Sequence, residues 1–133
     1  MPADLIDLLV AEHRRLEWLF ADVDTAATDR ARRRALDAVA AALDRHAAAE
    51  REFLHPALRE YLPAGAEIAM YEAGQHASFA ALPAGELPDA VRLHLQEEET
   101  ELFPRLRAAC PREELARLGE LLESARVTDR PRG

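Results

Sequence analysis

The sequence holds histidines and glutamates at positions where their side chains can meet in the core and bind metal ions. Four stretches of the chain each carry one histidine in line with their apolar residues. These histidines are His13, His46, His76 and His94. Glu50 and Glu98 follow the second and fourth histidines by four residues, which puts them one helical turn along on the same face. Imidazole and carboxylate together suit iron, manganese or zinc, whereas calcium and magnesium prefer oxygen ligands alone.

The cost of burying these six side chains favours metal binding. One histidine on an apolar face is more often a hydrogen-bonded core residue than a ligand. A whole layer of such groups in a protein core is costly unless they are paired or bound to a cation. Six groups exceed what one tetrahedral zinc ion needs, but they fit two metal ions about 3.5–4 Å apart with carboxylates between them.

The elements that must position these residues are helices. Strong helix formers dominate the sequence, and proline and glycine gather at residues 63–65 and 83–85 and at Pro111. A softer break falls at residues 25–29, where Thr28 or Asp29 can cap the next helix. Between the breaks, apolar residues recur at intervals of three and four. We therefore predict an all-α fold, an antiparallel up-down-up-down four-helix bundle with an additional C-terminal helix packed outside it.

The distances along the chain predict that the four histidines share one level of the bundle. About 16 residues separate His13 from the break near Asp29, and about 17 separate that break from His46. About 8 residues separate His76 from Ala84, and about 10 separate Ala84 from His94. Antiparallel helices of these lengths bring the histidines to within about one turn of a common layer.

An internal repeat links the second and fourth helices. After His46 and after His94, a glutamate follows by four residues, a leucine by eight and a proline by ten. The prolines of the two copies are Pro56 and Pro104. The repeat indicates a duplicated helix pair.

Size and charge limit the other classes of function. The 133 residues predict one domain over residues 1–127, with a frayed tail over residues 128–133. The single cysteine excludes an internal disulfide and a cysteine-based zinc cluster. The formal charge of −8 disfavours nucleic acid and anionic membranes as partners. The N-terminal residues lack the layout of a signal peptide, and no apolar run suits a membrane span, so a cytoplasmic location is expected.

In this order, the motifs resemble the hemerythrin-like (HHE cation-binding) family over nearly all of residues 4–109. The matching pieces are Glu12-His13-Arg14, His46-x3-Glu50, His76, and His94-x3-Glu98 with Leu102-Phe103-Pro104. Each piece alone is weak evidence, but the ordered set is specific. The resemblance implies a non-haem centre of two iron ions in a four-helix bundle, with manganese or zinc as alternative metals. It implies as ligands His13, His46, Glu50, His76, His94 and Glu98, of which Glu50 and Glu98 are the expected bridges.

The chain departs from the oxygen-carrying members of that family at two positions. Those members have a histidine four residues before His76, where this chain has Glu72. Because Glu72 lies on the apolar line, we interpret it as a metal ligand or as a hydrogen-bond acceptor for one. Those members also place the last carboxylate five residues after the histidine, at Glu99 here. On a regular helix the side chain at i+4 lies closer in direction to His94, so Glu98 is predicted, and only a local bulge would favour Glu99.

The remaining residues of interest receive less prominent roles. His55 follows His46 by nine residues, half a turn out of phase, and is interpreted as a surface or packing residue. Glu101 is a candidate for orienting a ligand. Trp18, Tyr61 and Tyr71 are candidate neighbours of the site, although ordinary core or surface packing is favoured for them. The arginines at residues 14–15 and 32–34 are interpreted as solvated.

Two ferrous ions with open coordination bind O₂, nitric oxide or peroxide, and this leads to two main hypotheses. In the first, the protein binds one of these small molecules for sensing, carriage or iron handling. In the second, it is a di-iron enzyme of peroxide breakdown, repair of nitrosative damage or O₂-dependent oxidation of a small molecule. A third, structural hypothesis is a metal-free bundle with an unusual polar layer. More carboxylate ligands stabilise the ferric state, so Glu72 argues against a pure oxygen carrier. The expected assembly is a monomer or a homodimer.

Overall fold

The computed structural model describes residues 2–129, and the side chains of residues 2–127, as a set of helices without strands. Two of the helices continue through a five-residue π-helical segment into a short further helix. The elements are α1 (Leu5–Thr25), α2 (Asp29–Ala49), η1 (Glu50–Leu54), α3 (His55–Tyr61), α4 (Gly65–Phe79), α5 (Leu87–Glu97), η2 (Glu98–Leu102), α6 (Phe103–Ala109) and α7 (Arg112–Asp129). The all-helical prediction is confirmed for this part of the chain.

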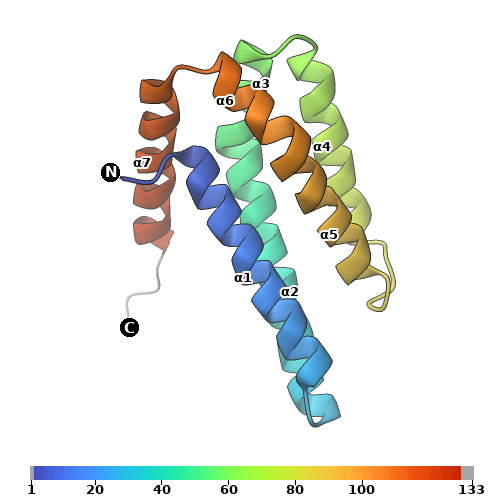
Figure 1. Cartoon of the computed structure of the whole chain (residues 1–133). Helices are drawn as coiled ribbons and strands as arrows, with labels where there is room; N and C mark the ends of the chain where they lie inside the picture. Colours follow the sequence, from blue (N-terminus) through green and yellow to red (C-terminus); the bar gives the residue numbers. More distant parts are fainter. Residues whose placement is uncertain (1, 130–133) are drawn as a thin grey trace.

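The helices are arranged as a bundle (Figure 1). The α1 helix lies beside α2, and α5 lies beside α4, while α7 packs against α1 outside these four. In the same view, α1 and α2 extend beyond the ends of α4 and α5. Among the described residues, no helix is long and apolar enough to span a membrane.

The predicted breaks lie where the helices end. Thr28 caps α2, because its side-chain oxygen accepts a hydrogen bond from the backbone N–H of Ala31 at 3.0 Å. The break before α4 turns at Ala64, whose backbone is left-handed with φ of 57°. Gly65 follows because the chain passes very close to α3 there, and a Cβ atom at this position would lie 1.8 Å from the carbonyl oxygen of Leu58.

The π-helical segments coincide with the internal repeat. Each begins at the glutamate of one copy and precedes the proline, which lies in the first turn of the next α-helix. In each, a backbone N–H donates five residues back, from His55 to Glu50 and from Phe103 to Glu98. A proline has no N–H and crowds the carbonyl four residues before it, and the wider π turn accommodates this. The repeat is therefore a repeated backbone feature.

The candidate ligands divide the apolar core into two clusters. One cluster lies toward the start of α1, around Leu9, Leu54 and Leu106, and the other toward its end, around Phe20 and Val91. Along α1, His13 lies between Leu9 of the first cluster and Leu16 of the second. The polar residues thus form one layer with apolar packing on both sides.

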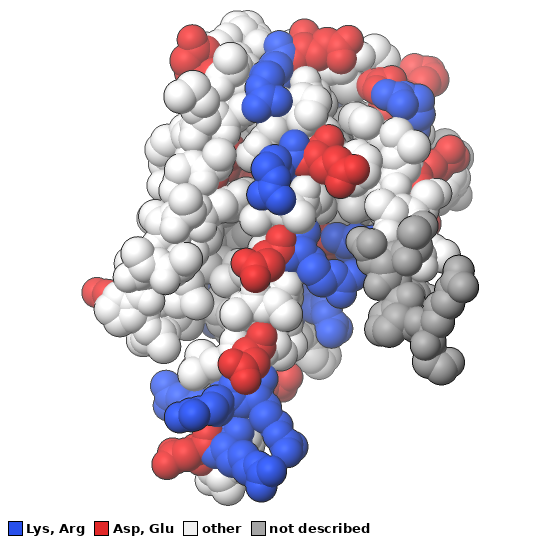
Figure 2. Space-filling model, turned by 180° about the vertical axis from the view of Figure 1, so that it is seen from behind, with Lys and Arg blue, Asp and Glu red and all other residues white. Residues whose placement is uncertain are grey.

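The exposed surface carries charged residues in groups. Figure 2 shows arginines gathered at the end of the molecule where α2 begins, and Arg32, Arg33 and Arg34 are exposed there. This agrees with their interpretation as solvated residues. Helix α7 runs to Asp129, and residues 130–133 of the expected frayed tail lie outside the described residues.

Candidate metal centre

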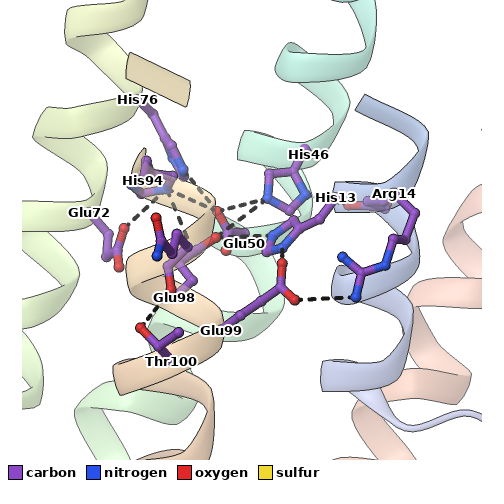
Figure 3. A network of polar contacts seen from close by, with 12 residues as sticks. His13, Arg14, His46, Glu50, Glu72, His76, His94, Glu98, Glu99 and Thr100 are labelled. Carbon is purple, nitrogen blue, oxygen red and sulfur yellow. Dashed lines mark hydrogen bonds and ion pairs between the residues drawn. The ribbon is translucent and has the colours of Figure 1, made fainter. Parts of the chain in front are cut away.

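The structure brings all seven predicted side chains to one level of the bundle (Figure 3). They come from four sequence-distant regions: α1, the junction of α2 with η1, α4, and the junction of α5 with η2. The side chains of Glu50 and Glu98 have no exposed surface, and even the most accessible of the seven, His76, is 12% exposed. The predicted common layer of histidines is therefore observed.

One part of the layer is formed by His13, His46 and Glu98. The Nε2 atom of His13 lies 3.2 Å from Oε1 of Glu98, and the Nε2 atom of His46 lies 3.8 Å from the same oxygen. One candidate ligand atom from each of the three residues lies within 4.8 Å of the other two. Atoms that share one metal ion at about 2.0–2.2 Å are themselves about 3–3.5 Å apart, so this spacing suits a shared cation.

The other part is formed by His76 and His94 with Glu50 and Glu72. Oε1 of Glu50 lies 2.8 Å from Nε2 of His76 and 3.9 Å from Nε2 of His94. Oε2 of Glu72 lies 3.3 Å from Nε2 of His94. Glu72 is only 6% exposed, so it belongs to the buried layer.

Glu50 and Glu98 connect the two parts. Oε1 of Glu50, besides facing His76 and His94, lies 3.3 Å from Nε2 of His46. Glu98 directs Oε1 toward His13 and its other oxygen, Oε2, toward Nε2 of His94 at 3.7 Å. Each carboxylate therefore faces imidazoles of both parts, which is the arrangement that a carboxylate between two cations requires.

Atoms without hydrogen-bond partners line the centre of this layer. The Nε2 atoms of the four candidate histidines, both carboxylate oxygens of Glu50 and of Glu98, and Oε2 of Glu72 are buried and make no hydrogen bond of standard geometry, although they lie within ion-pair distance of one another. Leaving a buried polar atom unpaired costs roughly 1–3 kcal/mol, and more when it is charged. Residues that bind cations would present such a cluster of nitrogen and oxygen atoms with free lone pairs. The side chains present therefore fit a metal centre.

The buried imidazoles and carboxylates of this layer shift one another's pKa values. Burial opposes the charged form of His46, yet the carboxylates of Glu50 and Glu98 raise its pKa to about 10. Burial, together with the positive charge on His46, lowers the pKa of His13 to about 4. Burial and the neighbouring charge of Glu50 hold the pKa of Glu98 well above its usual range. Metal binding must displace these protons, so it is coupled to pH.

Two further glutamates orient the histidines of the first part. Oε2 of Glu99 accepts a hydrogen bond from Nδ1 of His13 at 2.8 Å, and Oε1 of Glu12 accepts one from Nδ1 of His46 at 2.6 Å. With Nδ1 as the donor, the Nε2 atoms of His13 and His46 face the centre, and Nε2 of His46 offers a lone pair once its extra proton is lost. The tautomer follows from these partners.

Arginines stand behind both of these glutamates. Arg14, which is 65% exposed, lies 3.6 Å from Glu99, and Arg126 on α7 pairs with Oε2 of Glu12. Glu12 and Arg126 received no role from the sequence. A signal for Glu12 was present in the Glu12-His13-Arg14 motif, because a residue next to a candidate ligand on the same helix can reach a different histidine. Arg126 had none, because only the docking of α7 on α1 brings it to Glu12.

The structure places Glu98, and not Glu99, in the centre. A π-helical bulge is present, but it begins at Glu98, so the spacing from His94 to Glu98 remains that of a regular turn. Glu99, which is 27% exposed, reaches the outer nitrogen of His13 instead. The bulge therefore alters the direction of the residues that follow it.

That change of direction accounts for His55, whose expected phase was wrong. A regular helix from His46 would turn His55 away from the core, but the π turn between the two residues adds one residue to the turn. His55 consequently points inward, is 2% exposed and stacks on His76 with ring centroids 6.0 Å apart. Burial lowers the pKa of His55 to about 4. Its packing role is thus in the interior, next to the metal centre.

The remaining candidates do not line the centre. Glu101 is exposed, so the orienting role considered for it falls to Glu99 and Glu12. Trp18 is 76% exposed and Tyr71 is 57% exposed. Tyr61 packs against the apolar cluster around Leu54. Ordinary core or surface packing describes all three aromatic residues.

Comparison with known proteins identifies the family. A model of the family described as the hemerythrin HHE cation binding domain matches residues 4–82. No curated protein and no solved structure matches the chain. The matched range ends before His94 and Glu98, so their place in the centre rests on the geometry given above. Since the match covers more than half of the 133 residues and the His/Glu clusters are those of a metal site, the chain belongs to the hemerythrin HHE cation-binding family.

Proposed function

We propose that this protein is a non-haem di-iron protein that binds O₂ or a related small oxidant, nitric oxide or peroxide. In this proposal α1, α2–α3, α4 and α5–α6 act as an up-down-up-down scaffold, with α7 as an additional helix outside it. The role is sensing, carriage or iron handling, in the cytoplasm. A pair of iron ions supplies changes of oxidation state and open positions at which these small molecules bind.

The observation that carries the proposal is the convergence of buried ligand atoms in three overlapping groups. Four Nε2 atoms and five carboxylate oxygens are buried in one layer without hydrogen bonds. They divide into a His13–His46–Glu98 group and groups that contain His94 with Glu50 and His76 or with Glu72 and Glu98. The first two groups have no residue in common, and the third overlaps them through Glu98 and His94, which favours two cations. A mixed nitrogen and oxygen set favours iron, with manganese or zinc as alternatives.

The chain's own residues have distinct tasks in this proposal. His13 and His46 would hold one ion, and His76, His94 and Glu72 would hold the other. Glu50 and Glu98, which face imidazoles of both parts, would contribute to both and balance their charge. Glu12 and Glu99 keep Nε2 of His46 and of His13 directed inward through their hydrogen bonds to Nδ1.

Glu72 supports a second candidate function, that of a di-iron enzyme. A carboxylate in place of a histidine adds negative charge to one side of the centre and so stabilises its oxidised state. Such a centre releases O₂ poorly and suits peroxide breakdown, repair of nitrosative damage or oxidation of a small molecule. Glu72 therefore counts against a pure oxygen carrier.

Metal content and oxidation state, measured on anaerobically purified protein, test the proposal first. We expect close to two iron ions per chain when the protein is made in iron-supplemented cells. Well under one metal ion per chain would overturn the proposal and favour a metal-free bundle. Two manganese or zinc ions would keep the two-ion centre but contradict iron as its metal.

Rapid mixing of the reduced protein with O₂ then separates the two candidate functions. An absorption band that appears with O₂ and disappears under vacuum supports binding. Fast irreversible oxidation, or rapid consumption of added peroxide, supports the enzyme.

A further inference from the structure

A pocket of about 290 Å³ opens between α2, α4 and α5 and ends at the candidate metal centre. Its inner end is formed by three of the candidate ligands, His46, His76 and His94. Its outer rim includes the exposed residues Ala40 and Ala80. The pocket therefore connects solvent with one side of the imidazole layer.

The pocket is much larger than a diatomic molecule requires. A diatomic is about the size of water, whose share of liquid volume is about 30 Å³. An engineered apolar cavity of about 150 Å³ is sufficient to bind benzene. A pocket of about 290 Å³ lies near the lower end of the range typical of small-molecule sites, roughly 300–1,000 Å³. Its size thus suits an organic molecule with about one ring.

The walls of the pocket are mainly apolar. Phe79, Leu43, Leu87 and Val91 line it between the rim and the histidines. The ring of Phe79 lies 5.5 Å from that of His94, centroid to centroid, in an edge-to-face arrangement. These side chains favour an apolar ligand body, because removing its surface from water contributes about 25 cal/mol per Å².

Asp44 is the one carboxylate among the residues that line the pocket. Asp44 is exposed on α2, so its carboxylate stands at the outer part of the pocket. A carboxylate there favours a ligand that carries a positive charge at the end nearest to solvent. The overall formal charge of −8 acts in the same direction.

We propose that this pocket binds a small organic amine, with an apolar body of about one ring against Phe79 and Val91 and its ammonium group toward Asp44. The inference rests on the proposed function in one respect, since it names the class of molecule that lies beside the metal centre. It is carried by the size of the pocket, its apolar walls and the single carboxylate at its rim.

Calorimetric titration of the iron-loaded protein at pH 7 with benzylamine and with toluene tests the inference. We expect both probes to bind at one site per chain, with benzylamine about two- to fivefold tighter, as an exposed ion pair contributes little. Absence of saturable binding of either probe up to its solubility limit would overturn the inference.

Three variants locate the binding site. Ala40→Leu fills the rim and should weaken both probes at least tenfold, whereas Ala41→Leu, at the next and also exposed residue of α2, should leave them unchanged. Asp44→Asn should remove the preference for benzylamine and leave toluene binding as it was. Equal binding by the wild type and Ala40→Leu would show that the probes bind elsewhere and would overturn the inference.

The same samples keep this inference separate from the proposed function. Iron content and the absorption change with O₂ are measured on each of them. If both are retained while the probes do not bind, the pocket inference fails and the proposed function stands. If iron is absent while the probes bind as expected, the proposed function fails and the pocket inference stands.

Discussion

The two sides of the candidate metal centre are built from the same ligand types but are supported differently. His13 and His46 each donate Nδ1–H to a carboxylate, from Glu99 and Glu12. Aromatic rings pack on both sides: Phe103 stacks on His13, His55 stacks on His76, and Phe79 meets His94 edge to face. The first side thus has carboxylate partners at Nδ1 in addition to ring packing.

This difference implies a division of tasks between the two sides. A carboxylate on Nδ1 makes the imidazole a stronger ligand and fixes its orientation, so the side of His13 and His46 is the firmer one. His76 and His94 form the end of the open pocket together with His46, whereas His13 does not line it. We therefore expect exogenous molecules to approach the centre from the side of His76 and His94.

The largest effect on metal affinity is expected from a variant that removes a connection between the two sides. Glu98→Gln takes away the carboxylate that faces His13 with one oxygen and His94 with the other. We expect the affinity for both ions to fall by more than the roughly 10- to 100-fold that is typical of losing an outer partner. Competition with a chelator measures this. Glu101→Gln, at an exposed residue of η2, is the control, and a loss confined to one ion would contradict the bridging position of Glu98.

The next effect concerns acid stability on the side of His76. Burial lowers the pKa of His55 to about 4, so the folded protein keeps His55 neutral while the unfolded chain takes up a proton near pH 6.5. The contribution of His55 is therefore fully present above pH 6.5 and is lost as the pH falls toward 4. In metal-free protein, the free energy of unfolding of the wild type should fall as the pH is lowered over this interval. We expect the fall to be about 2–3 kcal/mol smaller in His55→Leu.

Urea unfolding at pH 7 and at pH 4.5 measures that difference. The wild type and the variant are compared under identical conditions, so that the titration of the other buried groups is common to both. Equal losses of unfolding free energy in the two proteins would show that His55 is not held neutral by its burial.

Variants of a glutamate that contacts one histidine should lower the affinity for one ion only. Glu12→Gln removes the charged acceptor of His46 and should weaken one ion by about 10- to 100-fold while the other is retained. Glu72→Gln, which removes a proposed ligand on the side of His94, should weaken the other ion and leave the first one in place. Two-step release to a chelator distinguishes the ions. The comparison between the sides would be wrong if both variants weakened the same ion.

The smallest effect is expected from α7. Arg126→Gln removes the ion pair that supports Glu12, and Arg126 is 30% exposed, so we expect only a severalfold loss of affinity, on the side of His46. Arg117→Gln on the same helix, which breaks an exposed pair with Glu114, is the matched control. If the two variants had identical metal affinity, the ion pair between α7 and Glu12 would have no influence on the candidate metal centre.

The sequence alone determined the helices and the composition of the polar layer. The apolar period of three to four, the capping by Thr28 and the proline and glycine breaks are local signals, so they could be read without coordinates. The common level of the histidines followed from chain lengths between the breaks, because an α-helix rises by a fixed amount per residue. The choice of Glu98 over Glu99 followed from the same regular geometry.

Only the tertiary structure decided what surrounds that layer. The inward direction of His55 depends on a π turn, and a phase count that assumes a uniform helix misses it. The approach of Arg126 to Glu12 depends on how α7 docks on α1, and the pocket at Asp44 depends on the separation of α2 from α4 and α5. Contacts between separate helices depend on how the helices pack. They join residues that are far apart along the chain, so a local sequence pattern does not predict them.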